Sequence, residues 1–406
     1  MENPKLRPIE ILPFQQQGRR LLLLRDPAQV KPVAVTMSLN ALPILRCLDG
    51  TNSLLDIQAA YARAGGDLLF RDDLERLLRH LDDALLLDSA HYRAERARME
   101  AEFREAPVRP MSHAGGAYPA EPDAFRAELE RQLAVAGPPR APARPAAVVS
   151  PHIDYARGGA TYAHAWAGVA LDGYARAVIL GTSHHAGERF ALTAKDHETP
   201  FGVMPADRDF IAGLERRCSF DLRAGEFAHR AEHSVELVAV LLHALAGGRE
   251  LPIVPILCGS FHDCVAARRS PAEAADVAGT LGALRETIAA APGETLVIAA
   301  ADLSHMGPRF GDPEPMGPAA LGSLEVDDRR SLAAAAAGDA EGFYRSIADH
   351  GDRRKVCGLP PIYALLALAP GAAGAVGDYR QCVDPDTGSV VTIAAMRFER
   401  GGRGGR

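Results

Sequence analysis

The chain has 406 residues, more than one domain usually contains, so two domains are expected. Its 47% hydrophobic and 24% charged residues are an ordinary globular balance. A formal net charge of −7 argues against a nucleic-acid-binding surface over the whole molecule. No run approaches the roughly 20 apolar residues that span a bilayer, and the first residues lack the layout of a secretory signal, so a cytoplasmic location is the default expectation.

Residues 1–95 are predicted to form a small helical domain. Leucines and other apolar residues repeat at helical spacing over three segments, 38–50, 53–64 and 71–85. The runs at 20–24 and 84–87 are candidates for short strands. Helices flanked by short β elements suggest a winged-helix-like module.

The same three segments carry a resemblance. LNALPILRCLDG, SLLDIQAAYA and DDLERLLRHLDDALLLD resemble the PqqD-like peptide-binding domains of modified-peptide biosynthesis. That resemblance implies recruitment of a peptide or of a partner enzyme such as a radical-SAM protein. The alternative interpretation is a structural or protein-docking three-helix unit.

Residues 96–109 are predicted as a linker, 110–400 as an α/β domain and 401–406 as a disordered tail. The α/β prediction rests on apolar strand candidates that alternate with helices. Their near-continuous apolar character is typical of strands covered on both faces. The alternation predicts a mixed, largely parallel central sheet flanked by helices. The strand candidates are 146–152, 177–185, 252–259, 295–305 and 390–398.

Three of these strands end in histidine: His152, His184 with His185, and His305. Ligands of open α/β sheets bind outside the carboxyl ends of the strands. A single histidine is more often a core residue than a ligand, but three at equivalent strand ends reverse that balance. The sequence therefore predicts one histidine-lined pocket at this edge, around a divalent metal ion.

A further histidine pair lies just before an apolar helix. His229, Glu232 and His233 form H-x-x-E-H, the inverted-zincin pattern. In a zinc hydrolase both histidines would bind the ion and Glu232 would act as general base. Against this, Glu232 at a helix start would also complement the helix dipole without any metal. The zinc hydrolase is therefore only a second alternative.

Eight motifs in order carry a resemblance over about residues 110–398. They are HAGGAYP (113–119), PHIDY (151–155), LGTSHH (180–185), TPFG (199–202), HRAEHSVE (229–236), IVPIL (253–257), DLSH (302–305) and CG (357–358). With these motifs the chain resembles the Memo family, whose bacterial members include AmmeMemoRadiSam system protein B. That family is similar in fold to the LigB-type class III extradiol dioxygenases.

The resemblance implies roles for particular residues. His152 and His184 take the positions of the two metal-binding histidines, and His233 that of the acid/base histidine, with His229 and Glu232 as further catalytic candidates. Dioxygenases use a carboxylate as third ligand, and animal Memo proteins place a cysteine where this chain has Ser304. The alternatives for that ligand are Asp302, His305, His233 or water. The residues expected in the substrate pocket are Tyr155, His185 and Cys357.

A set of two histidines and one carboxylate suits Fe(II), and imidazoles also accept Cu or Zn. The leading hypothesis is therefore a metal-dependent redox or dioxygenase-like enzyme that acts on a small-molecule or peptide-derived substrate. The resemblance also implies radical-SAM and AMMECR-like protein partners, with no nucleic acid or membrane partner expected. The alternative is a non-catalytic ligand- or peptide-binding module that works with a radical-SAM partner.

Overall fold

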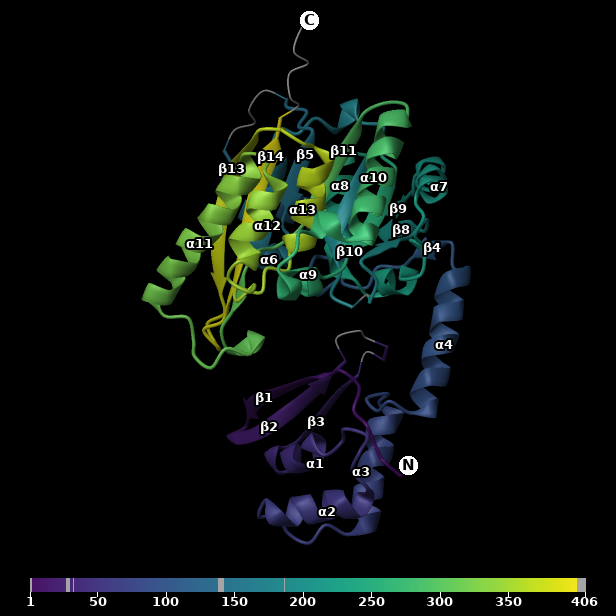
Figure 1. The fold of residues 1–406 in the computed structure, drawn as a ribbon, viewed down its shortest axis with the longest axis vertical. Coiled ribbons are helices and arrows are strands. Elements are labelled where there is room, and N and C mark those ends of the chain that lie inside the picture. Colours follow the sequence, from purple (N-terminus) through teal and green to yellow (C-terminus); the bar gives the residue numbers. More distant parts are fainter. Residues whose placement is uncertain (1, 27–29, 32, 138–141, 186, 400–406) are drawn as a thin grey trace, which may run out of the picture. The chain divides into compact units, whose positions relative to one another are not determined.

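The computed structural model describes residues 2–26, 30–31, 33–137, 142–185 and 187–399. The chain divides into two compact units, Met1–Glu105 and Ala106–Arg406, which are described separately (Figure 1). The first unit ends with helix α4 (Ala90–Glu105), so most of the segment predicted as a linker is helical and belongs to that unit. The tail 401–406, predicted to be disordered, lies outside the described residues.

The first unit begins with an antiparallel sheet in the order β1-β2-β3 and continues with helices. It therefore contains more β structure than the helical domain predicted from the sequence. The run 20–24 lies in β2 as expected, whereas 84–87 forms no strand and only Leu87 pairs with Leu6 in an isolated bridge. The relation to PqqD-like domains stays a prediction. The elements are β1 (Glu10–Gln16), β2 (Arg19–Arg25), β3 (Ala34–Ser38), α1 (Leu42–Arg46), α2 (Leu54–Arg63) and α3 (Arg71–Asp83).

The second unit contains a mixed sheet, which confirms the predicted fold class. Within the described residues this sheet has eight strands in the order β12-β14-β5-β11-β6-β10-β7, with β13 on the outer side of β14. Strands β5, β11, β6 and β10 are parallel, and both ends of the sheet are antiparallel. The strands are β5 (Ala147–Ser150), β6 (Arg176–Thr182), β7 (Phe190–Leu192), β10 (Ile253–Cys258), β11 (Thr295–Ala300), β12 (His305–Met306), β13 (Gly374–Val383) and β14 (Val390–Phe398).

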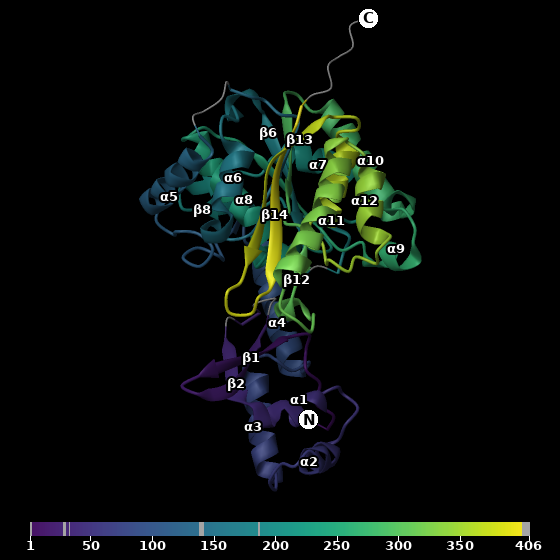
Figure 2. The same ribbon diagram turned by 90° about the vertical axis from the view of Figure 1, so that its left-hand side faces the viewer.

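Helices cover both faces of the sheet, as the apolar strands require. Figure 2 shows α5, α6 and α8 on one side and α7, α10, α11 and α12 on the other. Alternate residues of β6 point to the two layers: Val178 and Leu180 join one core, and Ala177 and Ile179 the other. The helices are α5 (Pro122–Val135), α6 (Tyr155–Trp166), α7 (Arg208–Arg217), α8 (His233–Ala246), α9 (His262–Ala267), α10 (Ala275–Ala290), α11 (Pro318–Ala336), α12 (Ala340–Ala348) and α13 (Leu359–Leu368).

A small sheet of β4 (Val108–Arg109), β8 (Asp196–Thr199) and β9 (Gly202–Met204) completes the second unit. Among the described helices, none combines the length and apolar character needed to cross a membrane.

The carboxyl ends of the three central strands lie level with one another. Ala300 of β11 pairs with Ser150 of β5 and with Gly181 of β6. Parallel strands in this register deliver the residues that follow them to one edge of the sheet, which is where His152 and His184 lie.

Gly181 lies where β6 passes the start of α8. A Cβ atom there would lie 2.6 Å from Ser234 Oγ and 2.7 Å from Val235 Cγ2. We expect Gly181→Ala to lower the free energy of unfolding by about 1–3 kcal/mol, measured by urea denaturation, because the added methyl overpacks this contact. The control is Gly322→Ala in α11, where a Cβ meets nothing within 4 Å. It is expected to raise the free energy of unfolding by about 0.5–1 kcal/mol, and equal stability of the two variants would contradict the packing argument.

Candidate metal centre

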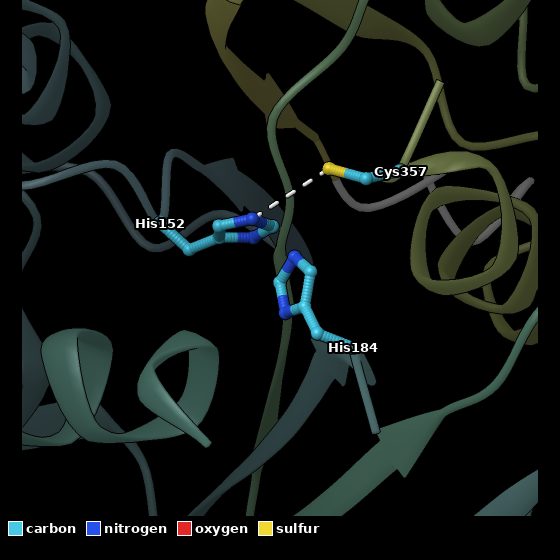
Figure 3. Close-up of side chains that lie close together, drawn as sticks. All are labelled: His152, His184 and Cys357. Carbon is cyan, nitrogen blue, oxygen red and sulfur yellow. Dashed lines mark hydrogen bonds between the residues drawn. The ribbon is translucent and has the colours of Figure 1, made fainter. Parts of the chain in front are cut away.

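Two strand-end histidines and one cysteine come together at this edge (Figure 3). The possible ligand atoms of His152, His184 and Cys357 lie within 4.8 Å of one another. Cys357 Sγ is 3.6 Å from His152 Nε2, and the two imidazole centroids are 5.2 Å apart. Cys357, expected only to line the pocket, thus supplies a third donor beside the two predicted ligands. Two imidazoles and a thiolate are a donor set that transition metals accept.

The outer nitrogen of each imidazole is already engaged. His152 Nδ1 lies 2.9 Å from the carbonyl oxygen of Ala300, and His184 Nδ1 lies 2.9 Å from Glu232 Oε1. Because each oxygen accepts the Nδ1–H, each ring in its neutral form carries its lone pair on Nε2. Fixing the tautomer through an outer oxygen acceptor is the usual arrangement of metal-binding histidines, so these residues fit an ion.

Glu232 is buried and holds several elements of the site together. Its carboxylate caps helix α8 by accepting the backbone N–H of His233 and Ser234, and it also accepts the backbone N–H of His184. Burial raises the pKa of Glu232, but the adjacent His184 outweighs it and holds that pKa well below the ordinary value. Burial lowers the pKa of His184, but Glu232 raises it well above the ordinary value. Glu232 is therefore an ionised, hydrogen-bonded anchor.

The H-x-x-E-H segment does not form the helix that a zincin needs. His229 lies in a short 3-10 helix (Glu226–Arg230), whereas α8 begins only at His233, after Glu232 in extended conformation. The His229 ring is buried and its Nε2 lies 2.9 Å from the carbonyl oxygen of Ala191. Burial lowers the pKa of His229 to about 4, so the ring is neutral. His229 is thus a structural histidine, and the two histidines of the motif do not face one ion.

His233 lies beside the candidate centre. Its ring stacks on His184 at a centroid distance of 4.7 Å and lies 5.2 Å from His152 and 5.5 Å from His113. His233, Glu232 and His184 form a second group of possible ligands that shares His184 with the first. Burial holds the pKa of His233 well below its ordinary value, although Glu232 opposes the shift. The side chain is therefore a neutral imidazole at the edge of the centre.

Ser304, the position where a third ligand was expected, points elsewhere. Its hydroxyl is buried and donates to Asp328 Oδ1 at 2.6 Å. Among the described residues, the group of possible ligands around His152 contains Cys357 and includes neither Asp302 nor His305. The prediction of Ser304 as a third ligand is therefore corrected in favour of Cys357. The loop before α13 brings the cysteine to the centre, whereas the serine side chain turns away from it.

Asp302 and His305 flank the centre. Asp302 Oδ1 accepts the backbone N–H of His152, and Oδ2 lies 3.7 Å from His152 Nε2. His305 Nδ1 lies 3.1 Å from the carbonyl oxygen of Leu303, and its ring packs edge-on against Phe310. Asp302 raises the pKa of His152, and His305 lowers the pKa of the Cys357 thiol.

Of the predicted pocket residues, Tyr155 belongs to the core. Its ring stacks on Tyr162 and its hydroxyl donates to the carbonyl oxygen of Leu237 at 2.6 Å. The prediction that Tyr155 lines the pocket is corrected, since both its ring and its hydroxyl are occupied inside. His185 is exposed, with its ring 6.2 Å from that of His184.

The metal-free centre favours a thiolate beside an imidazolium. Burial lowers the pKa of His152, but Asp302 and Cys357 outweigh it and raise that pKa to about 9. Burial raises the pKa of the Cys357 thiol, but His305 and His152 outweigh it and lower that pKa to about 6. At neutral pH the sulfur is therefore in the form that binds metals.

A buried ion pair that the sequence analysis missed holds the Glu232 side of the site. Arg109 and Glu236 are each 1% exposed and form a salt bridge. Arg109 also donates to the carbonyl oxygens of His229 and Glu232, which fixes the segment before α8. Tyr118 of the HAGGAYP motif donates to Glu236 at 2.5 Å. The HAGGAYP motif was the sequence signal that could have indicated this cluster. Arg109 itself lies in the segment that was predicted as a linker.

Known proteins resemble this chain over different lengths. A sequence model of the family described as Memo-like protein matches residues 109–397. A MEMO1 family protein of Aquifex aeolicus is 24% identical over 401 residues, which cover 98% of this chain and all of that protein. A MEMO1 family protein of Thermus thermophilus is 31% identical over 64% of this chain and 73% of its own length. The memo-1 homolog of Caenorhabditis elegans is 33% identical over 38% of this chain and 44% of its own length.

The acidic thiol of Cys357 can be tested by alkylation. In metal-free protein its reaction with iodoacetamide is expected to show a pH midpoint near 6, because His305 and His152 favour the thiolate. His152→Asn removes one of these charges and should slow the reaction at pH 7 by roughly tenfold. Mass spectrometry of the peptides measures each site, and Cys258, whose buried thiol has a raised pKa, is the unreactive internal control. A parental midpoint near the ordinary thiol value of about 8.5 would contradict the expectation.

Proposed function

Because the chain belongs to the Memo-like protein family, we propose that it is a metal-dependent redox protein in which His152, His184 and Cys357 hold a redox-active ion, iron or copper. The observation that carries the proposal is the shared orientation of the two imidazoles. Each has its Nδ1 bonded to an oxygen and its Nε2 left for an ion beside the cysteine sulfur.

The choice of metal follows from the third donor. Fe(II) was expected from the two-histidine, one-carboxylate pattern, whereas the group of possible ligands that contains both histidines has the Cys357 sulfur as its third member. Thiolate and imidazole together suit copper as well as iron, so both are proposed. A bound ion of either kind would supply electron-transfer chemistry and open positions for a substrate. Dioxygenase-like activity with a carboxylate ligand is the less favoured form of the proposal.

The exposure of the side chains around the centre indicates from which side a substrate would approach. The side chains of His152 and Glu232 are 2% and 1% exposed, whereas those of His184 and His233 are 28% and 32% exposed. A small-molecule or peptide-derived substrate would therefore enter over His184 and His233. On this path His233 is a neutral imidazole, which can accept a hydrogen bond from a bound substrate, and Glu232 orients His184.

Elemental analysis tests the proposal directly. Protein purified without oxygen is expected to contain about one equivalent of iron or copper, lost in the double variant His152→Ala, His184→Ala because both imidazole donors are removed. The control is His80→Ala, His91→Ala, which removes two histidines of the first unit and should keep the ion. Absence of metal, even after reconstitution, would leave a ligand-binding pocket as the better account, and zinc alone would contradict a redox role.

Metal binding should depend on pH. Since the pKa of His152 is raised to about 9, its ring is protonated at pH 7 and must lose that proton to bind an ion, whereas Cys357, with a pKa of about 6, is already ionised. Apparent affinity is therefore expected to rise between pH 7 and 9, by up to roughly tenfold per unit for each proton released. Calorimetry in buffers of different ionisation enthalpy measures the release. Asp302→Asn should reduce it, because Asp302 raises the pKa of His152. Affinity independent of pH over this range would refute the interpretation.

A further inference from the structure

Cys357 reaches the centre from a loop rather than from a strand end. The loop of residues 349–358 joins α12 to α13 and contains two non-glycine residues in the left-handed region, Asp352 (φ 49°) and Lys355 (φ 51°). Each such residue costs roughly 1 kcal/mol or more. The internal hydrogen bonds of the loop include those from the backbone N–H groups of Lys355 and Val356 to Asp352. Residues in this region persist where surrounding contacts over-determine them, so the contacts that the loop makes outside itself bear on its conformation.

Two backbone hydrogen bonds dock this loop on the segment that follows β11. The backbone N–H of His305 donates to the carbonyl oxygen of Arg354 at 2.7 Å, and that of Cys357 donates to Leu303 at 3.3 Å. The backbone of Cys357 is thus tied to the 303–305 segment and, through the Thr182 hydroxyl that donates to its carbonyl oxygen at 3.2 Å, to the end of β6. The rest of the loop depends on what fixes Arg354.

Asp328 of α11 is the fixed point between these segments. Its carboxylate is 1% exposed and has four hydrogen-bond donors. Oδ1 accepts from Ser304 Oγ and from Arg354 Nη1, and Oδ2 accepts from Thr392 Oγ1 at 2.6 Å and from Tyr379 OH at 3.0 Å. The donors come from four separate segments, so one side chain joins β13, β14, the residues after β11 and the Cys357 loop.

We propose that Asp328 is a positioning residue that fixes the Cys357 sulfur through its buried ion pair with Arg354. The inference rests on the proposed metal site and adds the determinant of its sulfur ligand. Ser304, once expected to bind the ion, is in this arrangement one of the donors that hold Asp328. The two histidines depend on strand ends and on Glu232, so loss of Asp328 releases the sulfur and leaves the imidazoles in place.

The chain provides a matched control one residue away on each segment. Arg353 and Asp327 form an ion pair between the same loop and the same helix, but their side chains are 61% and 16% exposed, against 5% and 1% for Arg354 and Asp328. Exposed pairs contribute little to structure, so this pair separates a general effect of charge from the positioning effect.

The experiment uses the whole chain of 406 residues with Co(II) as probe. Co(II) bound to a thiolate gives a near-ultraviolet charge-transfer band that imidazoles do not give. The parent and the control double variant Asp327→Asn, Arg353→Met are expected to show the band, and Cys357→Ser to lack it. The double variant Asp328→Asn, Arg354→Met, which leaves no buried charge unpaired, should lose the band while binding Co(II) about 10- to 100-fold more weakly.

Ser304→Ala is the milder variant, because it removes one donor and keeps the ion pair. It is expected to retain the parental melting temperature within a few degrees and to weaken the band per bound Co(II), a ratio that a general loss of stability would not change. Parental band intensity and affinity in either Asp328→Asn, Arg354→Met or Ser304→Ala would overturn the positioning role. A parent that binds no Co(II), or whose band equals that of Cys357→Ser, would instead overturn the proposed metal site, and this inference with it.

Discussion

The buried carboxylate of Glu232 is the interaction on which the candidate centre depends most. Taking a charge out of water is costly unless hydrogen bonds and opposite charge replace the solvent. Glu232 receives these from the backbone of His184 and the start of α8, and from the His184 ring. A single group thereby sets where α8 begins, how the chain leaves β6, and which nitrogen of His184 is free.

The two sides of the centre are held by different means. His152 and His184 follow strands whose register is fixed by parallel pairing, so their backbone positions come with the sheet. The cysteine comes from a loop with left-handed residues and relies on the Asp328 cluster. Buried ion pairs, Arg109–Glu236 and Arg354–Asp328, lie behind the two sides. Breaking such a pair by removing one partner typically costs about 3–5 kcal/mol, which makes these pairs effective anchors.

The sulfur donor also changes the chemical comparison with the dioxygenases. A carboxylate ligand suits hard ions, whereas a thiolate suits softer ions and lower oxidation states. The carboxylates near this centre have other partners: Glu232 bonds the His184 ring, and Asp302 bonds the His152 backbone. They contribute to the charge of the site through hydrogen bonding, and the Cys357 sulfur is the anionic group that clusters with both imidazoles among the described residues.

The sequence by itself determined the α/β class of the second unit and the edge of the sheet where His152 and His184 meet, because apolar strands that end in polar residues need only local patterning. It also carried the ordered motifs of the Memo family. It did not reveal the strands β1 and β3, the core position of Tyr155, the structural role of His229 or the place of Cys357 beside the two histidines. Those features depend on contacts between distant segments: Cys357 is 205 positions from His152, and Ser304 turns to Asp328 because a hydroxyl buried there needs an acceptor. Only the tertiary structure decides which of several polar side chains near a strand end faces the centre, since that choice is made by the hydrogen bonds each finds after the chain has packed.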